Sequence, residues 1–234
     1  MEKSLFKPKF IERYKKLLGK EIDVFLEYLS KPLTKSIRVN TLKISVEKLV
    51  YRLKSKGWKL KQIPWCKEGF WVLEPGYELG NTVEFQLGYF YVQEAASMIP
   101  PLVLDPKPND VVLDLCASPG SKTTQIAAMM SNTGVLVAND VGIDRIKPLV
   151  ANLQRCGVAN TIVTIMDGRK FGKFKERFDK VLVDAPCSAV GAIRKDWSIA
   201  KMWNPNMIKG LARLQKSLVL AGFDALKSGG ILVY

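Results

Sequence analysis

The sequence has no histidine, and its few cysteines form no CxxC pair. Without histidine, the serine and cysteine triads that use an imidazole as general base are excluded, so any base must be another kind of side chain. The cysteines are widely spaced, which argues against a disulfide framework and against a zinc site. They are Cys66, Cys116, Cys156 and Cys187. We therefore expect no metal centre.

Long apolar runs are also missing. No stretch approaches the roughly 18 to 20 residues that a helix needs to span a bilayer. Residues 1–10 are charged and lack the apolar core of a signal peptide. These absences predict a cytoplasmic protein without a membrane partner.

Acidic residues are scarce relative to basic ones, at 22 against 36, which gives a formal net charge of +14. Such an excess favours a polyanionic partner, most simply nucleic acid, although a lysine-rich solubilising surface would give the same total. The excess is concentrated in one segment. The segment from Lys31 to Lys67, both included, contains eleven Lys or Arg residues and a single acid, Glu47. This distribution favours RNA as the partner.

Residues 36–73 carry a strand–helix–strand–strand pattern. The alternation SIRVNTLKI predicts a strand over residues 36–44, and Ser45 is the expected N-cap of a helix that ends at Gly57. Further strands are expected over residues 58–65 and 70–73.

An amphipathic helical region over residues 4–30, ended by Lys31-Pro32, precedes this pattern. Together they predict an N-terminal domain over residues 1–90, with a helical part and an RRM-like α+β sheet. Its basic and aromatic side chains could bind RNA backbone and stack bases. Alternatively, the sheet is a structural cap whose tryptophans belong to its core. The domain boundary is expected near residues 88–93.

From Val111 onward, buried strands alternate with helices. The five apolar runs are VVLDLC, GVLVAND, NTIVTIMD, FDKVLVDAPC and GGILVY. Near-continuous Val, Ile and Leu indicate strands covered on both faces, hence a parallel sheet of right-handed βαβ units. The predicted fold class over residues 91–234 is therefore α/β and Rossmann-like. Acids near four strand ends should line the carboxyl edge, where open α/β folds bind ligands. They are Asp114, Asp140, Asp167 and Asp184.

Small residues fill the loop CASPGSK, from Cys116 to Lys122, between the first of these strands and a helix. Such a turn lets backbone N–H groups approach a ligand carboxylate closely. The loop is neither a Walker A loop nor GxGxxG. Asp140 could accept both ribose hydroxyls of an adenosine cofactor, and Asp167 is placed to hold the adenine amino group. Alternatively, these acids only cap the helices that follow.

Two segments indicate the function more specifically than the strand-end acids do. DLCASPGSKTT, from Asp114, and DAPCSAVGAIRKDW, from Asp184, resemble motifs I and IV of the NOL1/NOP2/Sun family of RNA cytosine-C5 methyltransferases. Residues 36–42 (SIRVNTL) and 88–100 (GYFYVQEAASMIP) are similar to the same family. The resemblance implies an enzyme that uses S-adenosylmethionine (SAM) to methylate C5 of cytosine in tRNA or rRNA.

The resemblance also implies the cofactor site. Asp140 with Arg145 would hold the ribose side of SAM, Asp167 the adenine, and Asp184 would lie between the cofactor and the cytosine. The residues expected around the methionine part are Cys116, Ala117, Ser118, Pro119, Gly120, Ser121 and Lys122. The sequence departs from the family pattern at several positions. The family usually has alanine, glycine, glutamate and glycine where this chain has Ser118, Ser121, Asp140 and Ala189.

The remaining expectation concerns which cysteine acts as the nucleophile. Methylation of cytosine C5 uses a thiolate that adds to C6, and DNA methyltransferases place that thiolate where Cys187 lies. In the RNA family the nucleophile is instead a second cysteine, in a Thr-Cys-Ser after the fifth strand, and the cysteine matching Cys187 is associated with product release. Here the fifth run, GGILVY, reaches Tyr234 without a Thr-Cys-Ser. We expect Cys187 to be catalytic, with Asp184 and Lys122 in support; without histidine, Lys122 or Arg194 would have to activate the thiol.

The resemblance thus implies a C-terminally truncated family member, whose methyltransferase domain lacks its last two strands. GGILVY would then be an exposed apolar edge unless another strand pairs with it. One hypothesis is half of a split methyltransferase, completed by a C-terminal polypeptide. The other is a module that binds SAM and RNA but does not transfer the methyl group.

Overall fold

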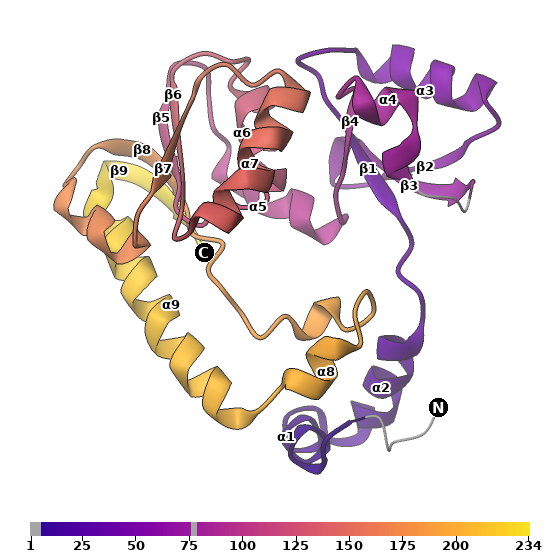
Figure 1. Cartoon of the computed structure of the whole chain (residues 1–234), viewed down its shortest axis with the longest axis vertical. Coiled ribbons are helices and arrows are strands. Elements are labelled where there is room, and N and C mark those ends of the chain that lie inside the picture. Colours follow the sequence, from indigo (N-terminus) through magenta and orange to yellow (C-terminus); the bar gives the residue numbers. More distant parts are fainter. Residues whose placement is uncertain (1–5, 76–78) are drawn as a thin grey trace. The chain divides into compact units, whose positions relative to one another are not determined.

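The computed structural model describes residues 6–75 and 79–234, and residues 4 and 5 of the expected helical region lie outside this part. The described residues divide into two compact units. The first contains the chain up to Leu33 together with residues 186–216, and the second contains residues 34–185 and 217–234. Figure 1 shows the elements of both units in sequence colours.

The first unit is helical and is built on aromatic side chains. Phe10 and Trp203 are both fully buried, and their ring centroids are 5.1 Å apart. The expected helical region is confirmed as two helices separated at Gly19, whose φ of 55° ends the first one. The elements are α1 (Pro8–Leu18), η2 (Gly19–Glu21), α2 (Ile22–Ser30), η6 (Val190–Ala192), α8 (Ser198–Met202) and the start of α9 (Pro205–Ala225).

The second unit begins with an antiparallel sheet in the order β2-β3-β1-β4. With helices after β1 and β3, this is the ferredoxin-like βαββαβ arrangement. Ile37, Leu49, Leu53, Trp58 and Phe90 form its core between sheet and helices. The elements are β1 (Ser36–Val39), α3 (Val46–Ser55), β2 (Lys59–Ile63), β3 (Cys66–Glu74), η3 (Leu79–Asn81), α4 (Val83–Gln86) and β4 (Phe90–Val92).

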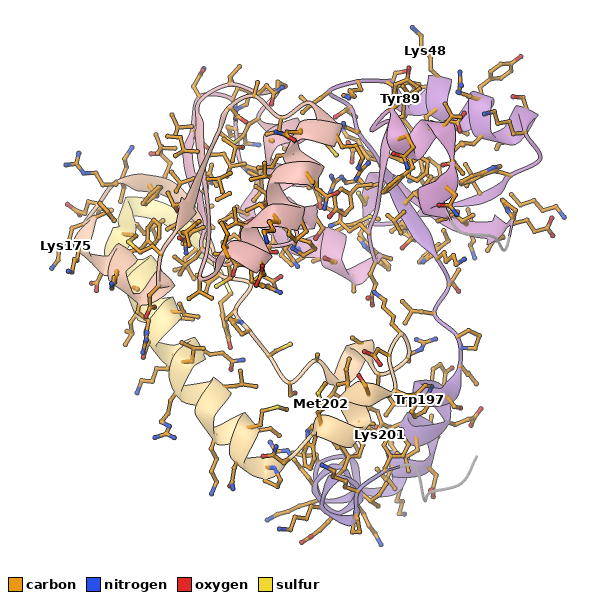
Figure 2. All side chains as sticks on the ribbon, in the orientation of Figure 1. Lys48, Tyr89, Lys175, Trp197, Lys201 and Met202 are labelled. Carbon is orange, nitrogen blue, oxygen red and sulfur yellow. The ribbon has the colours of Figure 1, made fainter. Side chains whose placement is uncertain are left out.

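Local sequence explains these elements, with one correction. The Ser45 side chain accepts a hydrogen bond from Lys48 N–H, so the predicted N-cap is confirmed, and α3 turns Lys48 outward (Figure 2). The strand predicted over residues 36–44 is too long, because Asn40 begins a turn in which its carbonyl accepts from Lys43 and Ile44 N–H.

Trp58 is part of the core, whereas Trp65 is 44% exposed. The aromatics of this sheet are therefore divided between structure and surface. The short strand β4 pairs with β1, so we propose the domain boundary after Val92 rather than between residues 90 and 91.

A five-stranded parallel sheet follows, in the order β7-β6-β5-β8-β9, as the apolar runs predict. The chain proceeds from β5 to β6 and β7 on one side and returns to β8 and β9 on the other. Helices α6 and α7 cover one face (Figure 1), and β9 is an edge strand of this sheet. The strands are β5 (Val111–Asp114), β6 (Val135–Asp140), β7 (Thr161–Ile165), β8 (Phe178–Leu182) and β9 (Leu226–Val233). The remaining elements are η4 (Ala96–Met98), α5 (Ile99–Leu104), α6 (Ser121–Met129), α7 (Ile143–Cys156) and η5 (Gly168–Lys173).

The two sheets of the second unit are joined at the end of α7. Asn40 Nδ2 donates to the carbonyl of Cys156 at 2.8 Å, and Lys43 Nζ donates to that of Arg155 at 2.8 Å. The backbone at Gly88 approaches so closely that an added Cβ would lie 1.9 Å from the Arg155 carbonyl oxygen. Side chains of the N-terminal sheet thus satisfy the last carbonyls of α7, which the helix itself leaves unpaired.

None of the helices in the described ranges combines the length and hydropathy needed to cross a bilayer. Within the same ranges, no group of three or more His, Cys, Asp or Glu side chains is arranged to hold a metal ion.

Candidate functional site

The candidate site lies at the carboxyl edge of the parallel sheet, where the strand order reverses around β5. The loops after β5 and β8 leave the sheet in opposite directions at this point, which in open α/β folds creates a ligand crevice. Asp114 and Asp140 end β5 and β6, and Asp184 follows β8 by two residues. The structure therefore brings the strand-end acids to one edge, as the sequence predicts.

The loop after β5 is shaped by Gly120, whose φ of 100° lies in the region that favours glycine. A Cβ there would also lie only 3.0 Å from Leu149 Cδ1. The first hydrogen bond of α6 runs from Thr124 N–H to Gly120 O at 2.9 Å. The N–H groups of Ser121, Lys122 and Thr123 therefore have no partner within the helix. This helix end can accept a carboxylate.

Asp140 is buried and fastens the loop. Its carboxylate accepts Ser118 N–H at 3.0 Å and Val141 N–H at 2.8 Å, and Arg145 Nε lies 3.4 Å from Oδ1. The predicted pair of Asp140 and Arg145 is thus in contact. The Ser118 hydroxyl donates to Arg145 O at 2.6 Å, so serine at this position ties the loop to the first turn of α7.

Asp114 is buried at the centre of this edge and received no role from the sequence beyond its place at a strand end. Its Oδ2 accepts the Thr123 hydroxyl at 2.7 Å, while Oδ1 has no hydrogen-bond partner in the described part of the chain. Burial raises its pKa to about 7; the charges of Asp184 and Asp140 add to the increase, whereas Thr123 and Lys122 oppose it.

Lys122 and Asp184 meet across the edge. The Lys122 ammonium lies 2.5 Å from Asp184 Oδ2, and the side chains are 13% and 53% exposed respectively. The lysine is thus enclosed, whereas the carboxylate keeps an open side that a ligand can reach. This ion pair connects the loop after β5 with the loop after β8. The sequence places the two residues in separate motifs and does not predict that they are in contact.

Asp167 has a partner that the sequence reasoning missed. Arg169 Nη2 lies 2.6 Å from Asp167 Oδ2, and the Arg169 N–H donates to Oδ1 at 3.0 Å. Hydrogen bonding from Arg169 lowers the pKa of Asp167 to about 2. The two-residue spacing, Asp-Gly-Arg, is the signal that could have found this pair.

The cysteines differ sharply in accessibility. Burial, reinforced by the charge of Asp114, raises the pKa of the Cys116 thiol to about 12, so this group stays protonated at neutral pH. Of the four cysteines, all in the described part, Cys187 alone is exposed. Cys187 belongs to the first unit, where its Sγ accepts Ala189 N–H at 3.3 Å.

Arg194, considered above as an activator of the thiol, has its guanidinium engaged elsewhere. It donates to the carbonyls of Lys31 and Pro32 at 2.7 and 2.8 Å, directly after the end of α2. Its side chain therefore stabilises the helical unit.

Family models match nearly the whole chain. Residues 101–234 match the model of 16S rRNA methyltransferase RsmB/F, and residues 6–95 match the N-terminal domain of 16S rRNA methyltransferase RsmF. Ribosomal RNA small subunit methyltransferase F of Vibrio campbellii is 49% identical over 232 residues, covering 96% of this chain and 48% of the relative. The chain thus spans about half the length of the curated relatives it matches.

Two solved structures are similar to this chain over nearly its whole length. A methyltransferase homolog protein from Pyrococcus horikoshii has a TM-score of 0.87 at 39% identity, over 100% of this chain and 77% of that one. NSun6 from Pyrococcus horikoshii, solved with SFG, has a TM-score of 0.90 at 29% identity, over 98% of this chain and 83% of that one. The expected Rossmann-like methyltransferase fold and the family resemblance are confirmed. The chain belongs to the RsmB/F family of 16S rRNA methyltransferases.

Proposed function

We propose that this protein uses SAM to methylate C5 of a cytosine in 16S rRNA. The observation that carries the proposal is the cluster of Asp114, Lys122, Asp140 and Asp184 around a tight loop, at the switch point of a sheet in the RsmB/F family. The relative from Vibrio campbellii is named as a methyltransferase of small-subunit ribosomal RNA. The net charge of +14 suits an RNA substrate.

The donors and acceptors at the edge fit SAM. The N–H groups at the start of α6 that have no partner within the helix suit its carboxylate, and Asp140 suits the ribose hydroxyls. A carboxylate oxygen of Asp167 suits the adenine amino group. The buried Asp114 Oδ1, without a donor in the described part, suits a cationic cofactor, because a nearby positive charge lowers the cost of ionising this carboxyl. When bound, SAM supplies an electrophilic methyl group on a sulfonium.

The remaining groups are assigned to the RNA base. Asp184 faces the cytosine with its open side, and Lys122 fixes that carboxylate through the ion pair. Cys187, the exposed thiol, acts on the C6 adduct or its release. The target base leaves its stack to reach this edge.

A second candidate function is binding of SAM and RNA without methyl transfer. It is favoured by the state of the other thiols: Cys66 and Cys156 are buried, and the pKa of Cys116 is raised to about 12. Cys187 is then the one exposed thiol of the described part that could act as nucleophile. The split-enzyme alternative differs: a further polypeptide segment, adding a strand beside the edge strand β9, would supply the nucleophilic thiol, and the complex would methylate ribosomal RNA in the cytoplasm.

Methyl transfer separates these functions. The purified chain is incubated with radiolabelled SAM and unmodified 16S rRNA, and SAM binding is measured separately by calorimetry. Lys122→Met should abolish transfer, whereas Lys147→Met, which removes an exposed lysine paired with Asp144, should not.

Transfer that is lost in Cys187→Ser shows that this thiol is required, as nucleophile or for release of the product, whereas transfer that survives the change excludes Cys187 as the nucleophile. Binding of SAM without any transfer supports the second function. Failure of the chain to bind SAM at all would refute both.

A further inference from the structure

Arg38 is a charged residue buried between the two sheets of the second unit. Ile37 and Val39, its neighbours on β1, belong to the core under the helices, so alternation along the strand directs Arg38 to the opposite face. The residue is 2% exposed and is among the largest fully buried side chains. A basic segment that the sequence assigns to RNA therefore contains at least one cation that solvent does not reach.

The partners of Arg38 come largely from α6. Its Nη1 donates to Ser121 O at 2.8 Å, and its Nη2 donates to Thr124 Oγ1 at 2.9 Å. Gln93 and Gln125 offer amide oxygens to Nη1. None of these partners is a carboxylate, and burial lowers the pKa of Arg38 to about 10. Glu68 acts on Arg38 only through its charge. A buried cation without a hydrogen-bonded counter-ion is costly, so a plain apolar contact would serve stability better.

Tyr91 stands beside Arg38 and reaches the same loop. The two residues are directly paired across β1 and β4, and the guanidinium carbon lies 5.7 Å from the centre of the Tyr91 ring. The Tyr91 hydroxyl donates to Pro119 O at 3.3 Å. One cross-strand pair of the N-terminal sheet therefore holds two carbonyls of the candidate cofactor loop, those of Pro119 and Ser121.

The hydrogen bond from Arg38 to the Ser121 carbonyl also bears on the N–H of Lys122, which belongs to the same peptide. In a planar trans peptide the C=O and N–H bonds point in opposite directions. When Arg38 holds the Ser121 carbonyl, the N–H of Lys122 in the same peptide is directed away from the N-terminal sheet. That N–H is one of the groups at the start of α6 that have no partner within the helix.

We propose that Arg38 and Tyr91 are positioning residues for SAM, which set the orientation of the loop peptides without touching the cofactor. The inference rests on the proposed function, because it takes SAM as the ligand of this loop. It assigns the N-terminal sheet a part in cofactor affinity in addition to its expected part in RNA binding. Asn152 Nδ2 and the Thr124 hydroxyl also donate to the Pro119 and Ser121 carbonyls, so loss of either contact with the sheet loosens these peptides without freeing them, and it weakens SAM binding.

The test uses the conservative variants Tyr91→Phe and Arg38→Lys, with Tyr89→Phe as the matched control. Tyr89, labelled in Figure 2, packs against the core on the helix-covered side of the sheet. SAM affinity is measured by calorimetry, amide hydrogen exchange over residues 119–124 by mass spectrometry, and thermal stability by circular dichroism. Loss of one hydrogen bond predicts a SAM Kd raised about three- to tenfold in Tyr91→Phe, with faster exchange in the loop.

Arg38→Lys should raise the Kd further, because lysine cannot reach both Ser121 and Thr124. Tyr89→Phe should change neither the Kd nor the exchange. A Kd and loop exchange equal to wild type in Tyr91→Phe would overturn the inference, even if Arg38→Lys failed to fold. Absence of SAM binding by the wild-type chain would instead refute the proposed function, and with it the choice of ligand.

Discussion

Replacing Asp114 with asparagine should change stability in opposite directions at low and high pH. The carboxyl is buried, one of its oxygens has no partner in the described part of the chain, and its pKa is raised to about 7 by burial. A group whose pKa is higher in the folded state binds protons on folding. Its contribution to stability is therefore complete below the unfolded value of about 3.9 and is lost as the pH rises through about 7.

The magnitude follows from the two pKa values. At pH 8 the ionised carboxyl lowers the free energy of unfolding of the wild-type chain by about 4 kcal/mol relative to a group that stays neutral. Asparagine stays neutral and can still accept the Thr123 hydroxyl, but it leaves a buried N–H without an acceptor, which costs about 1–3 kcal/mol. Asp114→Asn should thus be about 1–3 kcal/mol more stable than wild type at pH 8. At pH 3.5, where Asp114 is protonated in the folded state and mostly protonated in the unfolded state, the penalty dominates, and the variant should be the less stable protein.

Urea denaturation at a series of pH values, with Asp144→Asn as control, measures both limits. Asp144 is exposed and pairs with Lys147, so its replacement should change stability by no more than about 0.5 kcal/mol. The gain at high pH should be accompanied by weaker SAM binding, because a negative charge near a cationic cofactor is lost. A variant that is less stable than wild type at pH 8 would show that burial does not dominate the titration of Asp114.

Two further changes test backbone geometry. Ala189 has a φ of 54°, which strains a residue with a Cβ. Ala189→Gly should therefore stabilise the helical unit by up to about 1 kcal/mol in urea denaturation. A loss of stability would show that the backbone at Ala189 is not strained. Gly88→Ala should destabilise the protein by more than about 2 kcal/mol, because its Cβ would lie 1.9 Å from a carbonyl oxygen of Arg155. Gly19→Ala, at a φ of 55° with nothing within 4 Å of the new Cβ, isolates the cost of the positive φ. Equal losses at the two glycines would rule out the steric clash.

The parallel sheet could be predicted because buried strands have a distinctive composition. Runs of Val, Ile and Leu that end in acids specify both the strand and the edge at which its last side chain lies. The strand β4 (Phe90–Val92) is too short for such a signal, and it forms through pairing with β1, a contact between distant segments. The candidate site was predictable to the same extent: strand ends place Asp114, Asp140 and Asp184 at one edge.

Partnerships between side chains could not be predicted in the same way. Net charge counts Arg38, Lys43 and Arg52 as available to RNA. In the structure, Arg38 is hydrogen-bonded to α6, and Lys43 donates to the carbonyls of Leu87 and Arg155. Arg52 forms an ion pair with the buried Glu84. Of the three, Arg38 is buried, whereas Lys43 and Arg52 stay exposed. Composition records how many cations a segment has, but tertiary packing decides which of them are buried and which already have partners.

The contact between Asn40 and the end of α7 also bears on how the chain folds. The Asn40 amide and the Cys156 carbonyl are 116 residues apart in sequence. During synthesis the ribosome needs on the order of 10 s to supply the second after the first. Until then Asn40 lacks one of its two acceptors, and before residues 121–125 are made Arg38 lacks its partners on α6. The sheet therefore cannot reach its final state as an independent domain, and it completes folding only when the cofactor-binding half arrives.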